Sequence, residues 1–173
     1  MIENNILGII LAGGKSSRFG EDKSTAKLCN KTLLYNTVNK IENEFNEILV
    51  ISNNKEFNFK NNKIHVVEDC IEGQLGPLVG ILTAMKWVKK NNKNYKWIAS
   101  FPCDTPFFDM KFISELKIKI KETSKKLIFL KTFHSFGIFV RLSSKKFSII
   151  FNKVLILSTG LLIELLDKRL TEA

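Results

Sequence analysis

A glycine-rich, cationic segment near the N-terminus carries the residues best suited to phosphate chemistry. It reads Gly13-Gly14-Lys15-Ser16-Ser17-Arg18-Phe19-Gly20 and continues to Asp22-Lys23. Glycines let backbone N–H groups approach an anion closely. The Arg18 guanidinium can bind two phosphate oxygens at once, and Lys23 supplies a point charge. The segment therefore predicts a nucleotide site in which Arg18 and Lys23 bind phosphates; the alternative is an ordinary glycine-rich turn with solvated cations.

Two common glycine fingerprints do not fit this segment. A Walker A loop has four residues between its glycines, and counting from Gly14 places Phe19 where the second glycine is required. A dinucleotide fingerprint requires a different glycine spacing and an acidic residue near the end of the second strand, where Asn53 stands instead. The segment therefore indicates another class of nucleotide site.

Polar side chains follow three of the predicted strands. Asp104 comes after the apolar run 97–101 and is flanked by prolines. A carboxylate at the carboxyl edge of a parallel sheet suits Mg²⁺, which takes one or two protein oxygens together with phosphates and water. The alternative is an aspartate that caps the next helix. Asp69 ends another strand and would lie near the same edge; its simplest reading is a turn aspartate.

Asn53 ends the second predicted strand and offers both donors and an acceptor to a base or ribose. The assignment could shift by one residue, to Ser52 or Asn54. We retain Asn53 as the nucleotide contact to be tested.

The elements that must hold these residues alternate between strand and helix up to residue 120. Apolar runs predict strands over 6–11, 48–52, 64–68, 97–101, 127–131 and 136–140. Apolar residues at three- and four-residue spacing predict helices over 32–45, from Pro77 onward, and over 112–120. This alternation predicts an α/β fold with a mostly parallel central sheet covered by helices.

Composition narrows the functional classes. The chain has 173 residues, 45% of them apolar, which is enough for one domain with a substantial core. Its net charge of +10 suggests anionic partners, but the lysines are scattered and do not alternate with aromatic residues, so a nucleic-acid groove is disfavoured.

The cysteines and the N-terminus bear on the compartment. Three widely spaced cysteines, Cys29, Cys70 and Cys103, indicate neither a disulfide framework nor a zinc site. No basic region opens the chain, and its first apolar run is too short to span a bilayer. We therefore expect a soluble cytoplasmic protein with no membrane segment.

Three segments together carry a family resemblance. They are the Leu11-Ala12-Gly13-Gly14 segment leading to Lys23, then Val67-Glu68-Asp69 followed by Gly76-Pro77-Leu78-Val79-Gly80, and finally Pro102-Cys103-Asp104-Thr105-Pro106. In order and spacing the chain resembles the molybdenum cofactor guanylyltransferases over about residues 6–110. The resemblance implies a three-layer Rossmann-like nucleotidyltransferase fold.

The resemblance also implies an activity: Mg²⁺-dependent transfer of GMP from GTP to molybdenum cofactor (molybdopterin), with release of pyrophosphate. Asp104 would hold Mg²⁺ and would be a catalytic residue together with Arg18 and Lys23. The implied nucleotide contacts are Leu11, Ala12, Gly13, Gly14, Lys23, Asn53, Asp69 and Asp104. The implied partners are GTP, molybdopterin, and proteins among the molybdoenzymes or the enzymes of cofactor biosynthesis.

The resemblance ends near residue 141. We expect a single domain over 1–173 whose part from about 142 to 173 is atypical or truncated. Three other readings stay open: a related enzyme that uses CTP or a sugar phosphate, a catalytically impaired nucleotide-binding protein, and a basic nucleic-acid-binding module. The first two keep the same fold and pocket.

Overall fold

The structure is a computed structural model that describes most of the first 141 residues. It describes residues 5–13, 25–28, 30–54, 56–71, 77–104, 106–122, 127–131 and 136–141. All of them lie within one compact unit, Met1–Leu142. The segment 142–173, which we expect to be atypical, lies outside the described residues, so the single-domain assignment stays a prediction.

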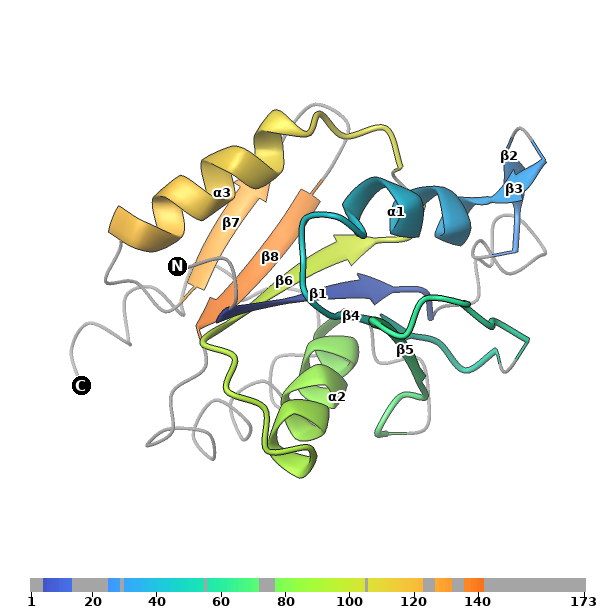
Figure 1. The fold of residues 1–173 in the computed structure, drawn as a ribbon, viewed down its shortest axis with the longest axis horizontal. Helices are drawn as coiled ribbons and strands as arrows, with labels where there is room; N and C mark the ends of the chain where they lie inside the picture. The colour runs from blue at the N-terminus through green and yellow to red at the C-terminus, as the bar shows by residue number, and fades with distance from the viewer. Residues whose placement is uncertain are drawn as a thin grey trace. The chain divides into compact units, whose positions relative to one another are not determined.

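A six-stranded sheet forms the centre of this unit (Figure 1). Its strands are β1 (Ile6–Leu11), β4 (Ile48–Ile51), β5 (Ile64–Val67), β6 (Trp97–Pro102), β7 (Leu127–Lys131) and β8 (Phe136–Arg141). In space they follow the order β5-β4-β1-β6-β8-β7. The first four are parallel, whereas β8 runs antiparallel to β6 and β7 antiparallel to β8. The predicted mostly parallel sheet is confirmed.

Helices cover both faces of the sheet. Helices α1 (Leu33–Ile41) and α3 (Lys111–Glu122) lie on one face, and α2 (Pro77–Lys90) lies on the other (Figure 1). Side chains alternate between the faces of a strand. Accordingly, Ile6 and Ile10 join the hydrophobic cluster of α1 and α3, whereas Leu11 lies against Gly80 of α2. This three-layer arrangement is the predicted α/β architecture.

Helix α1 is shorter than the periodicity predicts. Thr32 caps its start, since its hydroxyl accepts a hydrogen bond of 3.2 Å from the Tyr35 N–H. The helix ends at Ile41, and the chain turns through a Glu44 N–H to Ile41 carbonyl bond of 2.9 Å. Phe45 is nevertheless buried in the core. The helical spacing of apolar residues in the sequence extends to Phe45 because the turn after α1 places this side chain in the same hydrophobic cluster as the helix.

A small hairpin precedes α1 and is absent from the sequence prediction. It pairs β2 (Lys27–Leu28) with β3 (Lys31–Thr32) in antiparallel fashion. Asn30 lies between them with a φ of 65°, a conformation that asparagine tolerates better than most residues. The strands are only two residues long, too short for an alternating pattern to identify them.

Among the described residues, no helix has the length and apolar character needed to cross a membrane.

Candidate functional site

The strand register aligns the predicted site residues along one edge of the sheet. One row of paired residues runs across the four parallel strands: Val67, Ile51, Leu11 and Pro102. Two positions beyond this row, at the carboxyl ends of the same strands, stand Asp69, Asn53, Gly13 and Asp104. Four residues chosen from separate parts of the sequence therefore follow the ends of neighbouring strands at the same distance along the chain.

Backbone hydrogen bonds extend the sheet one residue past this row. The bonds run from Ser52 N to Val67 O (3.0 Å), from Ala12 N to Ile51 O (2.9 Å) and from Cys103 N to Leu11 O (3.2 Å). Each of these strands is thereby hydrogen-bonded to its neighbour at the residue just before Asn53, Gly13 or Asp104. The edge is consequently built on hydrogen-bonded backbone.

Gly13, Asn53 and Asp69 come together at this edge. A side-chain carbon added to Gly13 would lie 3.2 Å from Oδ2 of Asp69, so the Asp69 carboxylate occupies the space beside the glycine backbone. The Asn53 Oδ1 accepts a 3.0 Å hydrogen bond from the Asp69 N–H. The nucleotide contacts predicted on β1, β4 and β5 thus form one local cluster. Leu11 and Ala12 lead into it from β1.

The Asp69 carboxylate is half-buried and incompletely hydrogen-bonded. Its Oδ1 is inaccessible to solvent and has no hydrogen-bond partner among the residues that the structure describes. Burial raises the pKa of this carboxyl above 3.8. A hydrogen bond from the Thr83 hydroxyl would lower that pKa, but this hydroxyl donates to Val79 O instead. Buried oxygens normally have a donor. Asp69 therefore carries one buried acceptor that the described residues leave unpaired, on a carboxylate that is only partly exposed.

Asp104 stands at the end of β6, the strand beside β1, and its side chain is exposed. Within the described residues, no group of three or more His, Cys, Asp or Glu side chains could hold a metal ion. Mg²⁺ does not need such a group, because it binds through one or two carboxylates and completes its shell with phosphates and water. The single exposed carboxylate of Asp104 fits that mode of binding.

Two buried threonines support the edge, and the sequence reasoning missed both. The Thr37 hydroxyl of α1 lies 3.2 Å from the Cys103 carbonyl oxygen, next to Asp104. The Thr83 hydroxyl of α2 accepts a 2.9 Å hydrogen bond from the N–H of Cys70, next to Asp69. A polar residue on the apolar face of an amphipathic helix was the available signal, since both positions share the helical spacing of core residues.

The structure does not describe most of the residues predicted to bind phosphates. Gly14, Arg18 and Lys23 lie outside the described residues, so their placement and roles stay predictions. The described part of the site comprises Leu11, Ala12, Gly13, Asn53, Asp69 and Asp104.

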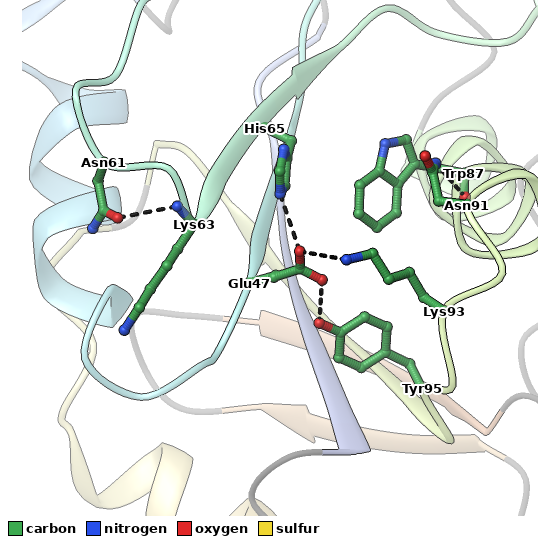
Figure 2. Close-up of polar contacts among 8 residues, drawn as sticks. All are labelled: Glu47, Asn61, Lys63, His65, Trp87, Asn91, Lys93 and Tyr95. Carbon is green, nitrogen blue, oxygen red and sulfur yellow. Dashed lines mark hydrogen bonds and ion pairs between the residues drawn. The ribbon is translucent and has the colours of Figure 1, made fainter.

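A second polar cluster lies at the opposite, amino-terminal ends of the strands (Figure 2). Glu47 precedes β4 and receives hydrogen bonds from Lys93 Nζ (2.8 Å) and from the Tyr95 hydroxyl. Its Oε1 also lies 3.3 Å from His65 Nε2, and the His65 ring packs against Trp87. Every group in this cluster has a partner within it, which is typical of a structural role.

The cluster changes the titration of its members. Burial alone would raise the pKa of Glu47, but the hydrogen bonds from Lys93, Tyr95 and His65 outweigh burial and hold that pKa below 4.5. Burial and the neighbouring Glu47 carboxylate raise the pKa of Tyr95 well above its usual range. Glu47 is therefore an ionised anchor between the start of β4 and the loop before β6.

Comparison with known families gives a match over most of the chain. A family described as the MobA-like NTP transferase domain matches residues 8–155. The molybdenum cofactor guanylyltransferase of Yersinia pseudotuberculosis serotype O:1b (strain IP 31758) is 31% identical over 116 residues, which are 66% of this chain and 57% of that protein. The protein of the same name from Yersinia pestis (strain Pestoides F) is 30% identical over the same shares. The chain thus spans a little over half the length of these relatives.

Solved structures share the fold at low sequence identity. The molybdopterin-guanine dinucleotide biosynthesis protein A of Archaeoglobus fulgidus superposes with a TM-score of 0.62 at 15% identity, covering 87% of this chain and 73% of that one. The 2-C-methyl-D-erythritol 4-phosphate cytidylyltransferase of Francisella tularensis gives 0.63 at 19% identity, covering 91% and 82%. The two likenesses show a common nucleotidyltransferase fold.

Proposed function

This chain belongs to the MobA-like NTP transferase domain family, and on that premise we propose that it transfers GMP from GTP to molybdenum cofactor. The products are the guanine dinucleotide form of molybdopterin and pyrophosphate. The observation that carries the proposal is the alignment of Gly13, Asn53, Asp69 and Asp104 on four adjacent strand ends. The names of the relatives, molybdenum cofactor guanylyltransferase, supply the substrates.

The donor nucleotide binds on the β5-β4-β1 side of the edge in this proposal. The Asp69 carboxylate is partly exposed at this edge, and guanine presents N–H groups that can donate to it. Gly13 leaves the backbone open beside that carboxylate. Asn53 holds the Asp69 backbone, and Leu11 and Ala12 border the nucleotide.

The reaction is a direct displacement at phosphorus. A terminal phosphate oxygen of molybdopterin attacks the α-phosphorus of GTP in line, a new P–O bond forms, and the bond to pyrophosphate breaks. No covalent enzyme intermediate is required, so catalysis consists of positioning and charge stabilisation. Arg18 and Lys23 offset the charge on the phosphates and the leaving pyrophosphate, and Gly14 contributes a backbone N–H.

Asp104 holds Mg²⁺ in this proposal. The bound ion supplies electrostatic stabilisation of the reacting phosphate oxygens. The exposure of Asp104 leaves room for the phosphates and water that complete a magnesium shell. We place the reaction in the cytoplasm.

A product assay tests the proposal. Purified protein is incubated with Mg²⁺, molybdopterin and GTP, and both the guanine dinucleotide and pyrophosphate are quantified. Parallel reactions contain CTP or ATP, and others omit Mg²⁺. We expect product with GTP and Mg²⁺ only. Product with CTP instead would identify a cytidylyltransferase, and binding of GTP without pyrophosphate release would identify a non-catalytic nucleotide-binding protein.

Asp104→Ala tests the role of the carboxylate. We expect this variant to lose about a hundredfold or more in kcat, because the bound ion would lose its protein ligand. Asp109→Ala is the matched control, since Asp109 is also exposed and caps the Lys111 N–H at the start of α3. Equal activity of the two variants would remove Asp104 from the mechanism.

A further inference from the structure

Two helices approach the site edge from opposite faces of the sheet, and each sends a buried threonine hydroxyl to a strand end. Thr37 belongs to α1 and has no exposed surface, and Thr83 belongs to α2 and is 2% exposed. Each hydroxyl contacts the backbone of a cysteine that adjoins one of the two site aspartates. The arrangement therefore repeats on both faces.

The Thr37 hydroxyl lies between two carbonyl oxygens. One is Leu33 O, four residues earlier in α1, at 3.1 Å, and the other is Cys103 O at 3.2 Å. The first contact is the usual one for a threonine inside a helix. The second links α1 to a residue 66 positions away, which directly precedes Asp104. The hydroxyl has a single hydrogen, which the two carbonyls share, and the Cys103 carbonyl belongs to the peptide unit that begins Asp104.

Thr83 performs the complementary contact on the other face. Its hydroxyl donates to Val79 O at 2.9 Å, four residues earlier in α2, and accepts from the N–H of Cys70 at 2.9 Å. Cys70 directly follows Asp69. The Asp69 backbone is held on its other side by the Asn53 amide oxygen. The two peptide units that flank Asp69 are consequently hydrogen-bonded to Asn53, just past the end of β4, and to Thr83 of α2.

We propose that Thr37 and Thr83 are positioning residues that set the site aspartates: Thr37 orients Asp104 for the metal ion, and Thr83 orients Asp69 for the nucleotide base. The proposal rests on the proposed function for the ligands of the two aspartates. Neither threonine touches substrate; each acts through the backbone beside an aspartate. Because α1 and α2 pack on opposite faces, the two contacts control the two halves of the site independently.

Matched substitutions at each threonine test this inference. Thr37→Val and Thr83→Val remove the hydroxyl and keep the branched shape, while Thr37→Ser and Thr83→Ser keep the hydroxyl. Val38→Ala, a buried neighbour of Thr37 in α1, controls for lost packing. The assay is GMP transfer as a function of GTP and Mg²⁺ concentration, together with thermal unfolding of each variant.

The two valine variants should affect different kinetic parameters. Small displacements of a catalytic group have large effects on rate, so Thr37→Val should lower kcat about tenfold or more and raise the Mg²⁺ concentration for half-maximal activity. Thr83→Val should mainly raise the KM for GTP. The serine variants should restore both values. Val38→Ala should lower the melting temperature and leave the KM for GTP and the Mg²⁺ requirement unchanged.

A second measurement does not depend on catalysis. Amide chemical shifts in NMR spectra should change at Asp104 in Thr37→Val and at Asp69 in Thr83→Val, and hydrogen exchange at Cys70 should become faster in Thr83→Val. The serine variants should resemble the wild type. Unchanged Asp104 and Asp69 shifts in the valine variants would overturn the inference whether or not the chain transfers GMP. A wild-type chain that makes no product, with the expected shift changes, would instead refute the proposed function alone.

Discussion

Gly13 and Asp69, 56 positions apart in the sequence, are in direct apposition at the end of the sheet: a side-chain carbon on Gly13 would lie 3.2 Å from the Asp69 carboxylate. The start of the glycine-rich segment and the end of β5 thus border the same small volume. This relationship makes both residues testable through their effect on each other.

Gly13→Ala should weaken nucleotide binding without unfolding the protein. A contact of 3.2 Å is tighter than an ordinary side-chain contact, so the Asp69 carboxylate must move by a few tenths of an ångström. We expect the affinity for Mg²⁺-GTP, measured by calorimetry, to fall about tenfold. Gly8→Ala is the control, because its new carbon meets Phe45 in the core. That variant should lose stability and keep its affinity; the reverse pattern would contradict the prediction.

Asp69→Asn should stabilise the protein while weakening GTP binding. Burial raises the folded-state pKa of Asp69 above 3.8, so the ionised form is disfavoured by folding. Stability is therefore lost as the pH rises from about 3.8 through the raised pKa, and the variant avoids this loss. The melting temperature of the variant should exceed that of the wild type at neutral pH.

The pH dependence of the melting temperature shows whether burial of the ionised Asp69 carboxylate causes the difference in stability. Near pH 3 the carboxyl is protonated in both the folded and the unfolded chain, so the two melting curves should converge. Asp109→Asn, an exposed position, should behave like the wild type throughout. An Asp69→Asn variant that is less stable at neutral pH would show that the carboxylate has a stabilising donor after all.

Glu47→Gln should reduce stability without affecting GMP transfer. The hydrogen bonds from Lys93, Tyr95 and His65 hold the pKa of Glu47 below 4.5. The contribution of Glu47 to stability is therefore present above about pH 4.5 and is lost as the pH falls through the lowered pKa. We expect the free energy of unfolding at neutral pH to fall by about 1 kcal/mol, because a charge-assisted hydrogen-bond acceptor becomes neutral.

Urea unfolding at several pH values measures this effect. The difference between Glu47→Gln and the wild type should shrink in acid, and Glu56→Gln, at an exposed position, should show no such dependence. Product formation by Glu47→Gln should match the wild type, since the cluster lies at the opposite ends of the strands from the site. Impaired product formation would assign the cluster a role in function.

Gly80→Ala should separate helix stability from nucleotide binding. The new carbon would lie 2.5 Å from Leu11 Cδ2, so the end of this side chain must shift. Alanine stabilises a helix interior by about 1 kcal/mol relative to glycine, which offsets the repacking. The melting temperature should therefore change little, while displacement of Leu11 lowers the affinity for Mg²⁺-GTP. Unchanged affinity in calorimetry would remove Leu11 from the nucleotide contacts.

The local pattern of the sequence was sufficient for most of the fold. The apolar run Ile6–Leu11 and the proline at the start of α2 correspond to the observed element boundaries, because strand and helix formation here depend on nearest-neighbour spacing and backbone restriction. The end of α1 was misplaced, since Phe45 has helical spacing yet packs from a turn. The β2-β3 hairpin escaped because pairs of two-residue strands leave no periodic signal.

The composition of the site could also be proposed from sequence: glycines, an asparagine and two aspartates after predicted strands favour phosphate and metal chemistry, with turn and capping roles as the alternatives. Only the tertiary structure determined that Gly13, Asn53, Asp69 and Asp104 occupy equivalent positions, because this follows from strand order and register. The contacts of Thr37 and Thr83 could not be predicted for the same reason. Their contacts join residues 66 and 13 positions apart, and such a hydrogen bond exists only once helix and strand pack together.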